Sequence, residues 1–113
     1  MRRVSANDVV NAYKATGLIP IRRAWESPDS RGGCAIDAIA RWSTSLSGEA
    51  WANQNLDPAY IKGFTDAWDA DAPAEVLEQQ ENNKRYLIGY WDAILCRNAV
   101  ENEFISITEV EVN

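Results

Sequence analysis

One helical phrase occurs twice in this chain, each time with a glycine in its middle. YIKGFTDAWD begins at Tyr60 and YLIGYWDAIL begins 26 positions later, with Tyr, Gly, Asp and Ala at matching places. A glycine inside a helix costs about 0.5 to 1 kcal/mol relative to alanine, so each of these needs a structural reason. Because residues four apart stack on one helix face, Gly63 and Gly89 each share a face with an alanine. We therefore predict that two helices cross closely at these glycines.

The residues around this predicted crossing are also candidates for a ligand pocket. The space that two glycines leave can be filled by a neighbouring backbone, or by a planar ring such as adenine. We favour backbone packing, with the aromatic rings closing around the crossing, and keep ligand binding as the alternative. The pocket candidates are Tyr60, Gly63, Phe64, Tyr86, Gly89 and Tyr90.

Three aspartates that stand next to a small residue are candidates for chemistry. Asp66 and Asp92 occupy equivalent places in the two phrases, and Asp37 stands before an alanine in an earlier helical segment. Converging carboxylates can raise one another's pKa for acid–base work, or hold a hard cation. The alternative, which we favour, is that each accepts a hydrogen bond from a tyrosine hydroxyl, an indole N–H or a helix terminus.

The chain contains no histidine, which removes Ser-His-Asp and Cys-His nucleophile activation. Cys34 follows two glycines near an expected helix N-terminus, where a thiol can become reactive, but a small buried side chain is the favoured interpretation. Cys34 and Cys96 match no metal-ligand spacing, and 69–71 is only a partial calcium-loop pattern that lacks its glycine. Asp66, Asp92 and Cys34 remain weak catalytic candidates, and we predict neither a metal site nor a cofactor.

A single, mainly helical domain over residues 1–113 is predicted from caps and apolar spacing. Four helices are expected, over 6–16, 34–46, 58–71 and 74–97, with Pro73 opening the last and a bend or a break near 82–83. EAWANQNL holds at most a short helical turn, and ESPDSRGG is expected to be a loop.

Two segments have the composition of β-strands. Pro20 restricts LIPI to an edge strand or an extended segment, and FISITEV near the other end of the sequence needs a partner. LIPI is its only obvious partner within the chain. We therefore expect a small helical bundle with a short two-stranded antiparallel element, formed by these two segments or completed by a second subunit.

Charge is unevenly distributed along the chain. The net charge is -6, with seven basic and four acidic residues up to Trp42 and four basic and thirteen acidic residues after it. From Asp66 to Glu81 there are six acidic residues and no basic residue. This balance makes nucleic acid an unexpected partner, because phosphate-backbone binding needs a basic surface. No apolar run approaches the roughly 18 residues of a membrane span, so we expect no membrane association and a cytoplasmic location.

The function class that these observations favour is a non-enzymatic protein-interaction or adaptor module. Its acidic face is expected to bind a basic protein, and the C-terminal strand to support a homodimer. The alternative is a binder of a small molecule or a metal, or a small enzyme, using Asp66, Asp92, Asp37 or Cys34 in an aromatic pocket.

Overall fold

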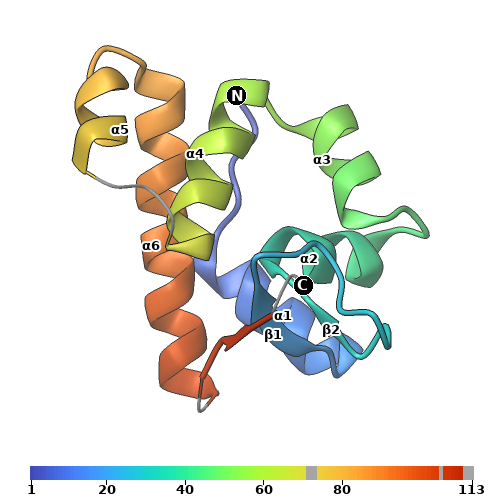
Figure 1. Cartoon of the computed structure of the whole chain (residues 1–113). Helices are drawn as coiled ribbons and strands as arrows, with labels where there is room; N and C mark the ends of the chain where they lie inside the picture. Colours follow the sequence, from blue (N-terminus) through green and yellow to red (C-terminus); the bar gives the residue numbers. More distant parts are fainter. Residues whose placement is uncertain (71–73, 105, 111–113) are drawn as a thin grey trace.

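The computed structural model describes residues 1–70, 74–104 and 106–110, and these residues form a mainly helical fold with one small sheet (Figure 1). In chain order the elements are α1 (Ala6–Thr16), β1 (Ile19–Arg22), β2 (Gly32–Gly33), α2 (Ala35–Ser43), α3 (Gly48–Asn55), α4 (Pro58–Asp69), α5 (Ala74–Gln79), α6 (Lys84–Glu103) and β3 (Thr108–Glu109).

Local capping explains where the best-predicted helices begin and end. Helix α1 has the predicted bounds: the Ser5 hydroxyl oxygen accepts a 3.1 Å hydrogen bond from the Asp8 amide, and Gly17 ends the helix with φ 71°. Helix α4 begins after Asp57, whose carboxylate accepts a 2.9 Å hydrogen bond from the Ala59 amide. It ends at Ala70 in the left-handed conformation. Side-chain acceptors at the N-cap and a left-handed residue at the C-cap satisfy backbone groups that lack intrahelical partners.

The prediction of four helices is wrong, because the described residues contain six. The predicted fourth helix is divided into α5 and α6, and the Asn83 side chain caps α6 by accepting a 3.2 Å hydrogen bond from the Tyr86 amide. Gly48 begins α3 because Ser47 supplies an N-cap before it, so all of EAWANQNL except its last residue belongs to a helix of eight residues and not to the short turn expected there. The predicted helix opening at Pro73 lies outside the described residues.

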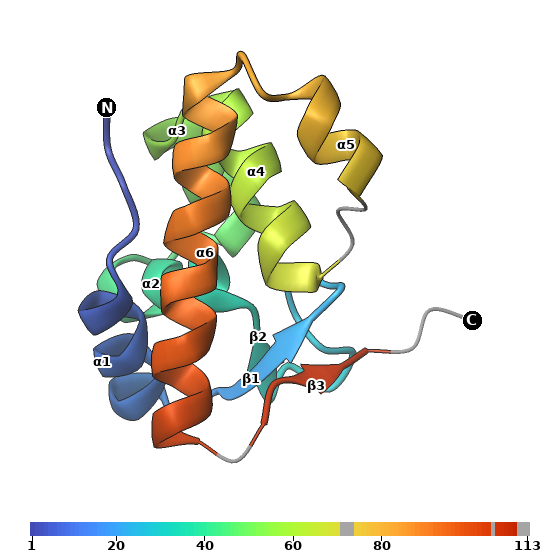
Figure 2. The same ribbon diagram turned by 90° about the vertical axis from the view of Figure 1, so that its left-hand side faces the viewer.

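The strands form a parallel sheet in the order β2-β1-β3, so the predicted antiparallel direction is wrong. The predicted two-stranded element with LIPI at an edge is wrong as well, because β1 is the central strand of three. The predicted partner segments do pair, with Ile21 opposite Thr108. Both strands follow helices that end at the same end of the molecule (Figure 2), where Lys14 Nζ lies 3.2 Å from Glu103 Oε2. The chain therefore enters β1 and β3 from one side and runs the same way along both.

Strand β2 lies in the segment that was expected to be a loop, and that prediction is wrong for its last two residues. Gly32 and Gly33 pair with Ile19 and Pro20 of β1. A Cβ at Gly32 would lie 2.7 Å from Ile21 Cγ2, and a Cβ at Gly33 would overlap the Asp37 carboxylate. Only residues without a side chain let the backbone pass between β1 and α2.

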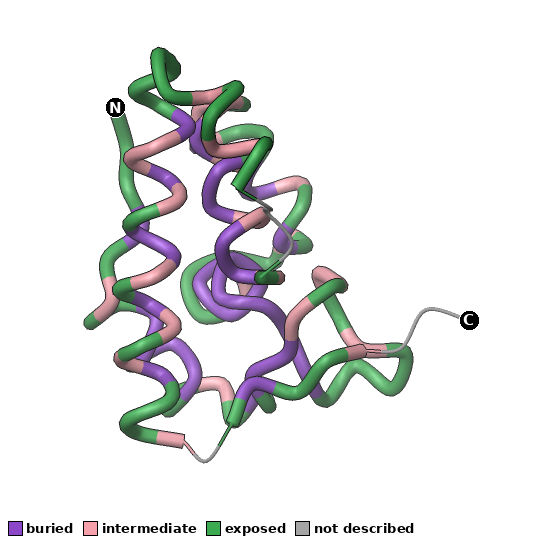
Figure 3. The backbone as a smooth tube through the Cα atoms, turned by 60° about the vertical axis from the view of Figure 1, so that its left-hand side comes forward, coloured by how far each residue is buried: buried purple, intermediate pink, exposed green. Residues whose placement is uncertain are grey.

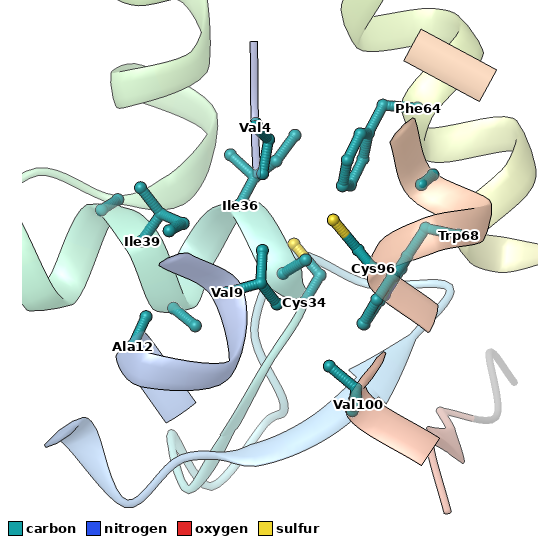
Figure 4. Packing of buried hydrophobic residues seen from close by; sticks show 14 of the residues in the cluster. Val4, Val9, Ala12, Cys34, Ile36, Ile39, Phe64, Trp68, Cys96 and Val100 are labelled. Carbon is teal, nitrogen blue, oxygen red and sulfur yellow. The ribbon is translucent and has the colours of Figure 1, made fainter. Parts of the chain in front are cut away.

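The core lies between the α4–α6 pair on one side and α1 with α2 on the other (Figures 2 and 3). Helices α4 and α6 run in the same direction, and α5 lies between them in the sequence (Figures 1 and 2). Figure 4 shows the sulfur atoms of Cys34 and Cys96 among the apolar side chains of this core, which include Val9, Phe64 and Trp68. Both cysteines are free thiols.

Candidate functional site

The crossing of α4 and α6 is built on the two glycines of the repeated phrase. A Cβ at Gly63 would overlap the carbonyl oxygen of Tyr86, and a Cβ at Gly89 would overlap the carbonyl oxygen of Tyr60. Each glycine therefore contacts the residue three positions before the other glycine. The space between the glycines is filled by main-chain carbonyl groups, as the packing interpretation predicts.

The tyrosines and aspartates of the two phrases form reciprocal hydrogen bonds across this crossing. The Tyr60 hydroxyl of α4 donates to Asp92 Oδ2 of α6 at 2.7 Å, and the Tyr86 hydroxyl of α6 donates to Asp66 Oδ2 of α4 at 2.6 Å. Burial raises the pKa of both tyrosines, and the hydrogen bonds to the carboxylates act in the same direction. Both phenols therefore stay protonated donors at neutral pH.

The Tyr60–Asp92 pair also holds the N-terminal segment of the chain. Arg3 binds Asp92 through two hydrogen bonds, from Nε to Oδ2 at 3.0 Å and from a terminal nitrogen to Oδ1 at 2.8 Å. The Tyr60 hydroxyl oxygen accepts a 2.7 Å hydrogen bond from the Val4 amide. Asp92 is thus a buried carboxylate with three side-chain donors, which is the arrangement that makes a buried charge tolerable.

Asp37 has a separate structural environment at the start of α2. Its Oδ1 atom accepts a 3.0 Å hydrogen bond from the Gly48 amide at the start of α3, and its Oδ2 atom lies 3.0 Å from Arg41 Nε. Burial raises the pKa of the Asp37 carboxyl, against the opposing effects of the Gly48 amide and Arg41. This carboxylate joins α2 to α3.

The three aspartates therefore have different partners, and the structure does not bring them into one site. Among the described residues, no group of three or more Cys, Asp or Glu side chains is placed to hold a metal ion. The arrangement of Asp66 and Asp92 corresponds to the interpretation in which each carboxylate accepts a tyrosine hydroxyl.

Cys34 lies at the N-cap of α2 and lines a small pocket. Its sulfur accepts a 3.4 Å hydrogen bond from the Asp37 amide, and burial raises the pKa of the thiol to about 12. At neutral pH the group is a thiol with little nucleophilic character. The neighbouring pocket has a volume of about 270 Å³ and is lined by Arg23, Ala24, Trp25, Cys34, Ile36, Phe64, Thr65, Trp68 and Asp69.

This pocket differs from the one expected at the glycines. Of the six pocket candidates, only Phe64 lines it, and none of Asp37, Asp66 and Asp92 does. The other candidates lie at the crossing, where rings lie close together along each helix: the Tyr60 ring is tilted against Phe64 at 6.1 Å, and Tyr86 stacks on Tyr90 at 6.4 Å, between ring centroids. Trp25 and Trp68 contribute to the pocket, and nothing in their sequence spacing brings them together.

A surface on α6 was missed by the sequence analysis. The buried side of α6 carries mainly small residues, including Gly89, Ala93 and Cys96, whereas Trp91 is 61% exposed and Leu95 is 60% exposed. We call Leu87, Ile88, Trp91, Ile94 and Leu95 the apolar face of α6; they follow the spacing of one helix side. Figure 2 shows α6 at the front of the molecule. Ile88 and Ile94 of this face also pack partly against the core, so its exposed part is formed by Trp91 and Leu95.

Helix α6 buries mainly small residues and exposes large apolar ones, and this arrangement has a physical cause. Close approach of the two main chains leaves no room for a side chain at Gly63 or Gly89. The large apolar residues of α6 therefore stand on its other sides, where the periodicity cannot distinguish a second apolar face from a core face.

Comparisons complete the description of this chain. None of the described helices combines the length and the apolar character needed to cross a membrane. No protein-family model matches the chain, and searches of curated proteins and of solved structures find no match.

Proposed function

We propose that this protein is a protein-interaction module that binds its partner through the apolar face of α6. The observation that carries the proposal is the exposure of Trp91 and Leu95, which lie one helical turn apart on α6. Tryptophan is enriched among residues that dominate binding energy, and contiguous exposed apolar patches mark interaction sites.

The polar candidate residues are bonded to other groups of the protein or buried, and this supports a binding role over catalysis. Asp92, Asp66 and Asp37 all accept hydrogen bonds that hold helices together, and Cys34 is a buried thiol with a raised pKa. A general base or a nucleophile must reach a substrate atom within hydrogen-bond distance. These groups instead face partners inside the protein.

Site-specific photocrosslinking in the cells that produce the protein tests this function. A benzophenone amino acid placed at Trp91 should give a covalent product heavier than the chain, because the side chain contacts the partner. The matched control is the same probe at Trp42 on α2, a tryptophan that is 45% exposed and lies outside the apolar face. The product should disappear when Leu95→Lys is combined with the probe at Trp91.

Equal crosslinking from the two probe positions, or none from Trp91, contradicts the proposal. A product that survives Leu95→Lys contradicts it as well, since a lysine in the centre of a desolvated apolar contact is costly.

An acidic surface at α5 supports a basic partner as a further part of this proposal. Glu75 and Glu78 are exposed on α5, which buries no residue, and Glu81 follows shortly after it. Binding through these acids would weaken with added salt, because exposed charges are screened. A partner identified by crosslinking whose affinity is indifferent to salt would leave the acidic surface without this role.

Small-molecule binding is a second candidate function, favoured by the pocket between α4 and the segment before β2. Trp25, Phe64 and Trp68 give this pocket aromatic walls next to Arg23. Its volume of about 270 Å³ suits only a small ligand. A screen of planar metabolites by thermal unfolding tests this role: a stabilising compound whose effect is lost in Trp25→Ala supports it, and a compound that acts equally on that variant does not.

A further inference from the structure

We propose that the partner of the apolar face of α6 is a second copy of this chain, which packs its own α6 antiparallel across a two-fold axis. This inference rests on the proposed function, because it names the partner for the same face. The axis passes near the middle of α6, so that Trp91 of each copy packs on Leu95 of the other. One surface patch on both subunits is what a two-fold dimer requires.

The charges at the two ends of α6 favour a second copy as the partner and an antiparallel direction for the pairing. Lys84 and Arg85 occupy the first turn, Glu101 and Glu103 the last, and neither an acid in the first turn nor a base in the last turn is present. This order opposes the helix macrodipole, which favours acids at the N-terminus and bases at the C-terminus. An antiparallel second copy brings each end against charges and a dipole of the opposite sign.

The neighbouring helices do not oppose the dipole of α6, although ion pairs within the chain neutralise one charge at each of its ends. Helix α4 runs in the same direction as α6 (Figures 1 and 2), with Arg85 near the start of α6 bound to Asp57 at the start of α4. Helix α1 ends beside the end of α6, where Lys14 pairs with Glu103. Within the described residues, the helices that pack along α6 therefore run in the same direction as α6, and their dipoles point the same way as its own.

Two charges remain available for a second copy on the side of the apolar face. Lys84 is exposed and makes no ion pair with the described residues, and Glu101 makes only a 3.8 Å contact with Arg97. Helical spacing places Lys84 on the same side as Trp91, and Glu101 along its border. In an antiparallel pairing, the two helices lie side by side, with the first turn of each next to the last turn of the other. Lys84 of each copy then lies near Glu101 of the other. A parallel pairing would instead bring like charges together.

Sedimentation equilibrium of the purified chain tests the stoichiometry. The expected result is a reversible monomer–dimer equilibrium. Leu95→Lys should weaken the dimer by at least about 100-fold, because it places a charge in the apolar contact. Trp42→Lys on α2 is the matched control and should leave the equilibrium unchanged. Trp91→Lys provides a second interface variant, and circular dichroism confirms that each variant is folded.

Charge exchange tests the antiparallel direction. Lys84→Glu alone and Glu101→Lys alone should each weaken the dimer by about five- to tenfold, because each creates two like-charged contacts. The double variant restores both opposite-charge contacts and should recover the affinity of the original chain. A mixture of the two single variants should form heterodimers in preference to either homodimer.

Specific results overturn the inference. A chain that stays monomeric at about 1 mM forms no dimer with a binding free energy of about 4 kcal/mol or more. This result overturns the proposed dimer. If the probe at Trp91 still crosslinks to a different protein, the interaction function stands and only the second copy is wrong. A dimer that is indifferent to Leu95→Lys and Trp91→Lys uses another surface, and one that is unaffected by either single charge change is not antiparallel.

Discussion

The Tyr60 hydroxyl donates a 2.7 Å hydrogen bond to Asp92 across the crossing of α4 and α6, and accepts another of the same length from the Val4 amide. One hydroxyl group therefore connects two helices and the N-terminal segment. Tyr86 makes the corresponding bond to Asp66, whose side chain is 21% exposed.

Removing the two hydroxyl groups should have unequal effects. Tyr60→Phe leaves the buried Val4 amide without a partner and removes one of the three hydrogen bonds to Asp92, and we expect a loss of about 2 to 3 kcal/mol in the free energy of unfolding. Tyr86→Phe should cost about 1 kcal/mol, because Asp66 retains contact with water and with Lys62. Urea unfolding of the two variants gives this comparison directly. Equal losses would show that the Val4 hydrogen bond contributes nothing measurable.

Adding a methyl group at the crossing should destabilise the protein strongly. Gly89→Ala forces its Cβ against the Tyr60 carbonyl group, which is main chain and cannot move without separating the helices. We expect a loss of about 2 to 4 kcal/mol, more than the typical cost of overpacking. The control is Asn98→Ala on the exposed side of α6, where alanine's helix propensity predicts a change within about 0.5 kcal/mol. Thermal melting of both variants is sufficient, and a Gly89→Ala protein that melts with its parent would exclude close backbone contact.

Asp37 should tolerate asparagine better than alanine. Asparagine keeps an oxygen that can accept from the Gly48 amide and removes a buried negative charge whose pKa is raised by burial. We expect Asp37→Asn to change the free energy of unfolding by about 1 kcal/mol or less, and Asp37→Ala to lower it by about 2 to 3 kcal/mol. Chemical denaturation of both variants checks the difference. A larger loss in the asparagine variant would show that the contact with Arg41 dominates.

Stability should decline at alkaline pH because of the two buried thiols. Burial raises the pKa of Cys34 and Cys96 to about 12, against an ordinary value of about 8.5. Above about pH 8.5 the unfolded chain releases these protons and the folded chain keeps them, so the folded state binds more protons and loses stability as pH rises. The full effect is about 1.4 kcal/mol per pH unit for each thiol.

Urea unfolding between about pH 7 and pH 9, below the titration of ordinary tyrosines near pH 10, measures this dependence. The control is the Cys34→Ser, Cys96→Ala double variant, in which the alkaline decline should be much smaller. A decline of the same slope in that variant would assign the effect to other groups.

Features that depend on neighbouring residues in the sequence were predicted well. Ser5 and Gly17 define α1 because a cap needs only the adjacent turn, and Gly63 with Gly89 indicated the crossing because a mid-helix glycine has few other uses. The cap residue Asp57 and the proline that follows it also predicted that α4 begins at Pro58.

Features that depend on distant residues were not predictable in the same way. The direction of β3 follows from where α1 and α6 end in space, and the strand at Gly32 exists only because β1 lies beside it. The bond of Arg3 to Asp92 joins residues with no shared sequence pattern. For the candidate interaction site, the spacing of Leu87, Trp91 and Leu95 is typical of an apolar helix stripe, but spacing cannot show that such a stripe faces away from the core.

Helix α5 buries no residue, although it lies in the connection between the two parallel helices of the crossing. The reciprocal contacts of α4 and α6 do not pass through it, since they join Tyr60 to Asp92 and Tyr86 to Asp66 directly. Covalent continuity at α5 is therefore not what holds these helices together. We expect the protein to function as a split pair, in which fragments 1–79 and 80–113, expressed separately, reassemble into the native fold.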